Sequence, residues 1–416
     1  MNPIHLSVSA AQESGAPLPP KPPGRLASLD AYRGLAMVLM ASGMLGLPNL
    51  AEHFPDQPFW QWVGFHWEHV SWAGCSLHDL IQPSFTFMVG VALPFSLAGR
   101  LAQSQSPASL WRHVLWRSLV LVLLGVALRS VNKPITNWTF EDTLTQIGLG
   151  YPLLYAISGW GRRAPWAALA VILAGYWTAF AAWPLPPADF PWEAYQGKAW
   201  FSGFQAHWNQ NSNVAWAFDR WFMNLFPRVD PFTGNGGGYS TLSFVPTLAT
   251  MVLGLVAGRW LKSDPPPGEE EFYEASPWRI IGLLVLAGAL CLVAGWGLDR
   301  LGWCPSVKRI WTPAWTLFSG GWCFLTMAGF YLVADVWGAK RLFFPLIVVG
   351  MNSIAAYVMA ERLEGFIGAM LHTHFGSKPF QILGETYGGL LHGGTVLGVL
   401  WLILYWMHRR KLYLKV

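Results

Sequence analysis

Charged residues are scarce in this chain. Asp, Glu, Lys and Arg make up only 12% of its 416 residues, whereas 53% are hydrophobic. The mean hydropathy is +0.34, and a composition so poor in charge suits a protein embedded in a lipid bilayer better than a soluble enzyme. The composition therefore predicts an all-α polytopic membrane protein.

Cysteine is also scarce, and its spacing argues against two common kinds of site. The four cysteines include no CxxC pair, so we expect neither a metal site nor a disulfide framework. The net charge of +5 is not gathered into a basic patch or a nucleic-acid-binding motif. No nucleic acid partner is therefore expected.

A secretory signal pattern is lacking as well. Residues 1–24 are rich in Pro, Ser and Ala, and no apolar core follows a basic region there. We interpret this segment as a disordered cytosolic tail.

Long apolar runs dominate the remainder. A membrane-spanning helix needs about 20 mostly apolar residues, and the sequence predicts about ten such helices. Several contain a glycine or proline, which membrane helices tolerate where neighbouring helices pack closely: Gly90, Pro94, Gly125, Pro152, Gly254 and Gly350. The predicted spans lie at 29–48, 77–98, 110–130, 143–159, 164–184, 241–262, 277–297, 311–336, 342–361 and 393–408.

The spans fall into two groups. The segment 263–276 contains a run of prolines and then of glutamates, and we interpret it as a cytosolic linker. It divides the chain into a first half of six spans, 25–262, and a second half of four, 277–416. No internal repeat relates the halves, which argues against a repeat-built transporter.

The basic residues set an orientation with both termini cytosolic. Most Lys and Arg residues then fall in inside segments, as the positive-inside rule requires. One loop disagrees, because 298–310 is assigned to the outside and carries Lys308 and Arg309. This orientation assigns three longer segments to the outer face: 49–76, the long loop 185–240, and 362–392. The tryptophans of these segments predict an aromatic belt or a surface for stacking sugars.

His69 is the leading candidate for chemistry. It precedes the second span, whose first turn contains Asp79, and a titratable imidazole beside hydrocarbon is costly without a purpose. A neutral imidazole can take a proton from an amine or hydroxyl near neutral pH. The alternative is an interfacial His bonded to backbone, with Asp79 as a helix-terminus charge.

Further polar groups interrupt the apolar segments. Asp30 and Arg33 open the first span, and Arg33 could either contact a phosphate or anchor the helix. The glycine-rich segment 232–242 is interpreted as a tight turn that lines a sugar site, and it includes Tyr239. Asn352 and Glu361, expected to face the bundle interior, share a predicted span with Ser353, and Gln146 lies in another. Interhelical hydrogen bonding is the plainer explanation for these groups.

Taken together, these segments resemble the heparan-α-glucosaminide N-acetyltransferase family of transmembrane acyltransferases, bacterial members included. The resemblance runs from Arg25 to the C-terminus. It rests on motifs in a specific order: Asp30-Ala31-Tyr32-Arg33-Gly34, His69-x-Ser71-Trp72-x-Gly74 with Asp79, Phe85 to Gly90, Gln146, 236–242, Lys308 to Pro313, and Gly350-Met351-Asn352-Ser353.

The resemblance implies that acetyl-CoA, held from the cytosolic side, supplies an acetyl group to an amino sugar on the opposite face. The prediction is a multi-pass acetyltransferase of the bacterial cytoplasmic (inner) membrane, with acetyl-CoA as co-substrate, no metal, and an amino sugar or glycan as acceptor. A homodimer is compatible with the resemblance. The predicted site comprises His69, Asp79 and Asn352 for catalysis, Arg33, Asp30, Gln146 and Ser353 for the cofactor, and Trp72, Tyr239 and Glu361 for the acceptor.

Two alternatives use the same residues. An amino-sugar permease would employ the tryptophans and intramembrane polar groups for recognition alone. An O-acetyltransferase of an envelope glycan keeps the chemistry and changes the acceptor. Direct transfer and a transient acetyl-His69 also stay open.

Overall fold

Helices account for nearly all the regular structure of the chain. The structure, a computed structural model, describes residues 26–263 and 276–414. Within these ranges the backbone forms fourteen α-helices, short 3₁₀ and π turns, and two isolated β-bridges, with no strand. The predicted all-α class is confirmed. The predicted tail at 1–24 and most of the linker at 263–276 lie outside the described residues.

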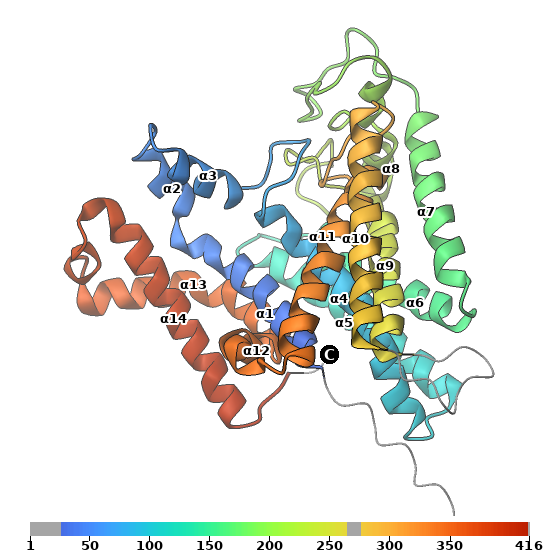
Figure 1. The fold of residues 1–416 in the computed structure, drawn as a ribbon. Helices are drawn as coiled ribbons and strands as arrows, with labels where there is room; N and C mark the ends of the chain where they lie inside the picture. Colours follow the sequence, from blue (N-terminus) through green and yellow to red (C-terminus); the bar gives the residue numbers. More distant parts are fainter. Residues whose placement is uncertain (1–25, 264–275, 415–416) are drawn as a thin grey trace, which may run out of the picture.

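Seven helices in the described ranges are long and apolar enough to cross a membrane, and a bent pair would make an eighth. This confirms a polytopic membrane protein. Most of the remaining helices are shorter (Figure 1). The seven are α4 (Ile81–Leu101) with the turn before it, α5 (Pro107–Ser130), α7 (Ala164–Ala181), α9 (Phe244–Lys262) with its preceding turn, α10 (Pro277–Arg300), α11 (Pro313–Phe330) with the π turn after it, and α14 (Gly388–Arg409) with its preceding turn.

Three of the ten predicted spans differ from a full straight helix. Two of them coincide with α1 (Ala27–Ala41) and α6 (Thr143–Gly159), which have 15 and 17 residues and are shorter than the seven. The predicted span 342–361 was wrong as one helix, because α12 (Phe344–Gly350) and α13 (Ser353–Phe375) meet at a 62° bend.

The bend has a local cause. Asn352 has a non-helical backbone at φ −124° and ψ 39°. Its side chain bonds the chain beyond α14, donating to the carbonyl of Leu412 at 2.8 Å and accepting from the N–H of Leu414 at 3.0 Å. An amide that satisfies another segment of backbone in this way interrupts the helical ladder.

Glycines bring the backbones of the central helices together. A Cβ added at Gly90 on α4 would lie 1.9 Å from the carbonyl oxygen of Met251, and one at Gly254 on α9 would lie 2.0 Å from that of Phe87. Only glycine permits such an approach, which is a common way for membrane helices to pack. The close packing predicted at these two glycines is confirmed.

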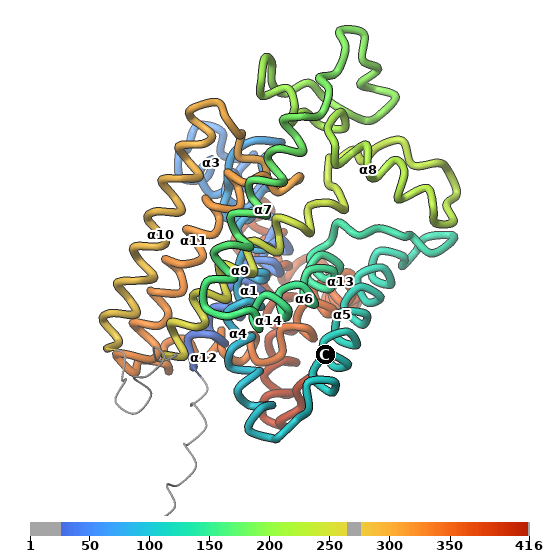
Figure 2. Tube along the Cα trace, turned by 90° about the vertical axis from the view of Figure 1, so that its right-hand side faces the viewer, coloured from blue at the N-terminus to red at the C-terminus, as the bar shows by residue number. Residues whose placement is uncertain are grey.

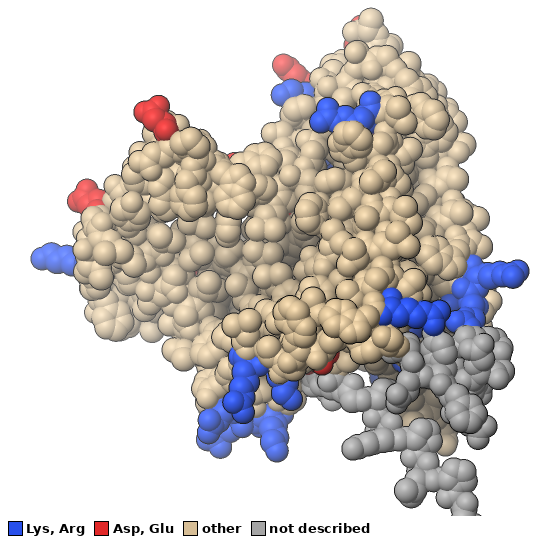
Figure 3. All heavy atoms as spheres, in the orientation of Figure 1, with Lys and Arg blue, Asp and Glu red and all other residues tan. Residues whose placement is uncertain are grey.

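The two ends of the bundle differ in chemistry. The short helices α2 (Leu47–Glu52) and α3 (Pro58–His66) and the loop 185–240 with α8 (Val214–Phe222) lie toward one end (Figures 1 and 2). Many of the Lys and Arg side chains visible in Figure 3 gather toward the opposite end. We call these the loop end and the basic end. Their separation agrees with the charge asymmetry used to predict orientation.

The loop at 185–240 shares a hydrophobic core with α7, the turn at Trp72 and the segment 304–314. Trp208 is fully buried and packs with Phe180 of α7, and Trp72 is buried beside them. Buried amides tie the loop together: Asn211 donates to the carbonyls of Tyr195 and Asn235, both at 2.8 Å. The prediction of an aromatic belt therefore fails for Trp72 and Trp208, which serve as core residues.

Candidate active site

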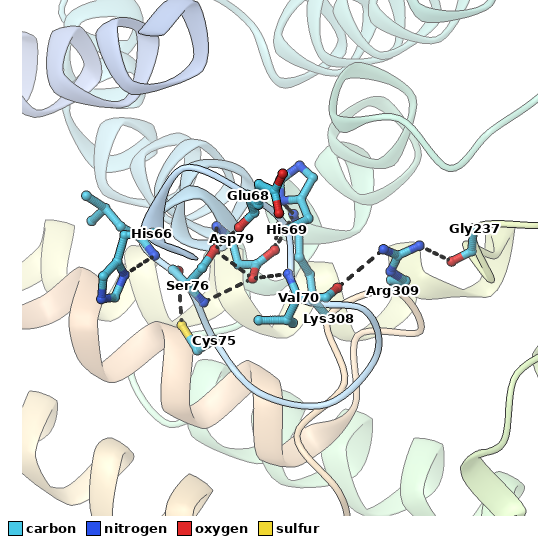
Figure 4. Close-up of polar contacts among 11 residues, drawn as sticks. His66, Glu68, His69, Val70, Cys75, Ser76, Asp79, Gly237, Lys308 and Arg309 are labelled. Carbon is cyan, nitrogen blue, oxygen red and sulfur yellow. Dashed lines mark hydrogen bonds and ion pairs between the residues drawn. The ribbon is translucent and has the colours of Figure 1, made fainter. Parts of the chain in front are cut away.

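His69 and Asp79 meet at the loop end. His69 lies in the turn after α3, and Asp79 lies in the 3₁₀ turn that leads into α4. Their side chains approach at 2.8 Å between Nδ1 and Oδ1 (Figure 4). The second carboxylate oxygen accepts the N–H groups of Val70 at 3.2 Å and Ser76 at 3.0 Å. Asp79 thus holds the whole turn around His69.

Nδ1 of His69 has two close neighbours, Oδ1 of Asp79 at 2.8 Å and Nζ of Lys308 at 3.0 Å. The ionised carboxylate only accepts hydrogen bonds, so the shorter of these two contacts favours the tautomer with a proton on Nδ1. Nε2 is then the basic nitrogen. The His69 side chain is 39% exposed, whereas that of Asp79 is 1% exposed. A buried carboxylate that orients an accessible imidazole is the arrangement that general-base catalysis needs.

His69 borders a cleft at the loop end. The cleft has a volume of about 490 Å³. Its wall includes Trp72, which was predicted to bind the acceptor, and Trp200, whose ring lies parallel to that of Trp72 at 6.3 Å. Glu68 and Ser71 also line it. An imidazole, a carboxylate and the partly exposed indole of Trp200 therefore share one opening, whereas the Trp72 indole is buried.

Lys308 is a buried neighbour that the sequence prediction omitted. Its Nζ lies 3.1 Å from Oδ1 of Asp79 and 3.0 Å from Nδ1 of His69, and its side chain is 6% exposed. Burial lowers the pKa of Lys308, and the charge of Asp79 acts in the opposite direction. The available signal was the loop 298–310, whose basic residues disagreed with the positive-inside pattern.

Arg309 joins two loops beside this pair. Its guanidinium donates to the carbonyl of Gly237 at 2.6 Å and to that of Val70 at 3.3 Å, and it lies 5.2 Å from the centre of the Tyr239 ring. Tyr239 is therefore connected to the His69 turn through Arg309. It does not line the cleft beside His69, and its predicted contact with the acceptor stays a prediction.

Two other predicted residues lie away from His69. Asn352 bonds the segment after α14, so the structure does not place it beside His69 as a catalytic group. Glu361 is exposed on α13 and does not line the cleft, which corrects the expectation that it faces the interior. Both predictions treated 342–361 as one straight helix, and the bend removes that assumption.

A second cavity lies toward the basic end and has a volume of about 720 Å³. Three of the residues predicted to bind the cofactor line it: Asp30, Arg33 and Ser353. The Asp335 carboxylate accepts the N–H groups of Ala27 and Ser28 and so fixes the start of α1, which carries Asp30 and Arg33. Arg33 lies 3.7 Å from Asp30.

The same cavity contains cationic residues that the prediction missed. Arg100, at the end of α4, lies 2.7 Å from Nε2 of His113 on α5. Arg117, one turn further along α5, lies over the ring of Tyr151 at 4.7 Å. Among the described lining residues, three arginines and this histidine face a single carboxylate, Asp30. The excess of positive charge suits an anionic ligand.

Gln146 lies between the two cavities. Its Oε1 accepts from Gln82, three residues beyond Asp79, at 3.1 Å and from Thr247 at 2.9 Å. The next residue, Ile147, lines the cavity at the basic end, whereas Gln146 does not. Gln146 was predicted to contact the cofactor, and the structure places it as a polar connection between α4, α6 and α9.

Two curated proteins match almost the whole chain. A heparan-alpha-glucosaminide N-acetyltransferase from Homo sapiens is 24% identical over 440 positions, which cover 95% of this chain and 60% of the human protein. The chain is thus similar to an acetyltransferase over nearly its whole length. The same-named protein from Mus musculus is 22% identical over 437 positions, covering 94% of this chain and 60% of its own length.

The match confirms the resemblance that the motifs predicted. The chain spans about 60% of the length of the curated relatives it matches. No family model matches the chain. The alignment extends over both the His69 turn and the cavity at the basic end, because only about 5% of the chain lies outside it.

Proposed function

We propose that this protein is a membrane acetyltransferase of the bacterial inner membrane. It takes acetyl-CoA from the cytosol and N-acetylates a glucosamine-type sugar at the periplasmic face. The observation that supports this most is the placement of an oriented, accessible imidazole at one end and a cationic cavity toward the other. The similarity to two heparan-alpha-glucosaminide N-acetyltransferases supports both the reaction and the acceptor.

The cavity at the basic end would hold the nucleotide part of acetyl-CoA. The phosphates of acetyl-CoA carry negative charge, and the cavity provides guanidinium groups suited to phosphate from Arg33, Arg100 and Arg117. The volume of about 720 Å³ falls within the range of small-molecule sites. The slender pantetheine arm would then extend past Gln146 toward His69.

The cleft at the loop end would hold the acceptor. Indole rings such as that of Trp200 suit the C–H face of a sugar, and the Glu68 carboxylate suits a sugar ammonium group before it loses its proton. The ammonium of Lys198 already lies 4.2 Å from the centre of the Trp200 ring, so this indole accepts a cation. These features favour an amino sugar over a neutral one.

The chemistry follows from the tautomer of His69. Nε2 removes a proton from the sugar amine while the nitrogen attacks the thioester carbonyl. The new C–N bond forms, the C–S bond breaks, and the CoA thiolate leaves. Asp79 stabilises the imidazolium, and Ser71, which lines the cleft, is placed to donate to the oxyanion. In the double-displacement variant, Nε2 attacks first and carries the acetyl group to the amine.

A transport assay tests this function directly. Proteoliposomes with acetyl-CoA on one side and glucosamine on the other are expected to form N-acetylglucosamine on the glucosamine side, measured by mass spectrometry. An amino-sugar permease would instead move unmodified glucosamine without acetyl-CoA. An O-acetyltransferase would modify a glycan hydroxyl and leave glucosamine unchanged. Either result would overturn the proposal.

The cationic residues of the basic-end cavity make a separate prediction. Arg100→Gln is expected to raise the KM for acetyl-CoA by about 10- to 100-fold, because a charge-assisted hydrogen bond contributes about 1.5–3 kcal/mol. The KM for acetyl-pantetheine, which lacks the nucleotide phosphates, should change little.

Steady-state kinetics with both donors measure this difference. Arg163→Gln, an exposed arginine at the start of α7, is the matched control. An equal change in KM for both donors would remove Arg100 from the phosphate site.

A further inference from the structure

The position of Lys308 calls for a function. Its ammonium is buried in a protein region that supplies few charges, and burying an ammonium is costly unless it is paired. It reaches the His69–Asp79 pair from the loop between α10 and α11, 229 residues away from Asp79 in sequence. Both the cost of burial and the distance in sequence indicate a specific use of this charge.

We propose that Lys308 is a positioning residue of the active site, whose ammonium keeps Asp79 ionised and thereby holds His69 in the tautomer with a basic Nε2. This inference rests on the proposed role of His69 and adds a third member to the pair. Lys308 acts through Asp79, so it does not itself contact the acceptor amine.

The hydrogen bonds around Asp79 support an ionised carboxylate. Oδ1 lies within 3.1 Å of both Nζ of Lys308 and Nδ1 of His69, and Oδ2 accepts the N–H groups of Val70 and Ser76. Each of these groups can donate, and a protonated Asp79 would have to donate to one of them instead. Without Lys308, the Asp79 carboxylate would lose its ammonium neighbour, the most strongly charged of these donors.

The loop that carries Lys308 is fixed to the turn that carries His69. The N–H of Gly74 donates to the carbonyl of Ser306 at 3.0 Å, and Ala73 forms a β-bridge with Val307. Arg309 binds the carbonyl of Val70. The β-bridge before Lys308 and the Arg309 contact after it therefore hold its ammonium at the pair, as a preorganised site requires.

The backbone after Lys308 supports the same view. Trp311 has φ at +50°, which is rare for a bulky residue. Its N–H donates to the carbonyl of Lys308 at 2.9 Å, and its buried indole donates to Thr250 at 3.1 Å. This turn is held in an unfavourable conformation by its surroundings, and such conformations concentrate at functional sites.

Because charged groups surround the His69–Asp79 pair, the effect of Lys308 can be tested by measuring how the reaction rate depends on pH. The titratable and charged groups that face the pair are Glu68, which lines the cleft with His69, Cys75 in the same turn, His78, whose ring centre lies 4.8 Å from that of His69, and Arg309 from the opposite loop. Burial raises the pKa of Cys75 to about 12, so its thiol stays neutral. Lys308 and Arg309 therefore supply the fixed positive charge.

Lys308→Met is the informative variant because methionine keeps the length of the side chain and removes the charge. We expect kcat to fall by about 10²-fold, since the imidazole is no longer held in one geometry. Without the ammonium, the His69–Asp79 pair takes up a proton at higher pH. The acid limb of the pH–rate profile should move upward by about one pH unit.

Two variants separate positioning from mere structure. Lys308→Arg keeps the charge and should restore the wild-type position of the acid limb, even if kcat stays low. Lys378→Met, which removes an exposed lysine shortly after α13, is the control and should match wild type. A folded Lys308→Met protein with an unshifted acid limb would overturn the proposal, as would equal profiles for the Met and Arg variants.

A second readout does not depend on acetyl transfer. Diethyl pyrocarbonate modifies unprotonated imidazole, and mass spectrometry can follow its reaction with His69 as a function of pH. Lys308→Met should shift this profile upward as well. If wild-type protein transfers no acetyl group, the proposed function fails, whereas the modification profile still decides the role of Lys308.

Discussion

His69→Ala protein is expected to transfer acetyl groups about 10²–10⁴-fold more slowly than wild type, the usual contribution of a positioned general base. The loss should appear in kcat, because Trp72 and Trp200 keep the walls of the cleft intact. Stopped assays with acetyl-CoA and glucosamine measure it. His53→Ala, which removes an exposed histidine from the same outer segment, is the control.

Added imidazole separates a chemical role from a structural one. A small base that diffuses into the vacated space should restore part of the activity of His69→Ala. Radiolabelled acetyl-CoA without acceptor should label His69 only if an acetyl-His intermediate forms. Wild-type activity in a folded His69→Ala protein would end the claim that this residue does chemistry.

The second large effect is expected for Asp79→Asn. The amide cannot hold His69 as the Nδ1–H tautomer, and a comparable loss of the orienting carboxylate in a serine protease lowers kcat about 10⁴-fold. Stability should also fall, by about 3–5 kcal/mol, because Lys308 becomes an uncompensated buried charge. Asp56→Asn, at an exposed position, is the control for both measurements.

The double variant Asp79→Asn with Lys308→Met isolates the two effects. It removes both buried charges, so its thermal unfolding midpoint should rise above that of Asp79→Asn alone. Its activity should stay low, because His69 still lacks the carboxylate. An unfolding midpoint for the double variant no higher than that of Asp79→Asn would contradict a charge pair between Lys308 and Asp79.

The membrane-spanning class could be predicted because it depends on local composition. A run of apolar residues long enough to cross a bilayer is visible in any window of the sequence. The same approach failed at α12 and α13. The apolar run continues through Met351, and the bend depends on Asn352 binding backbone near Leu412, sixty residues later. A contact with so distant a segment leaves no periodic signal.

The residues of the candidate site also divide into those that the sequence could predict and those that it could not. His69 and Asp79 are ten residues apart and belong to one short motif, so a family resemblance identified both. The predicted roles of Asn352 and Glu361 rested on a helical geometry that the bend removes. Arg100 and Arg117 counted only as inside basic residues in the prediction of orientation, and His113 was not singled out, because nothing in the order of the residues shows that they face one cavity with Arg33.

The sequence by itself determined that the chain spans a membrane, that its basic residues favour one side, and that His69 and Asp79 lie beside one span. Only the tertiary structure decided that Lys308 joins them, and it did so through a loop fixed to the His69 turn. Apolar runs and short motifs express energies between neighbours in sequence. The contact of a buried lysine with a carboxylate depends instead on the packing of segments far apart in the chain, and that packing exists only once the chain has folded.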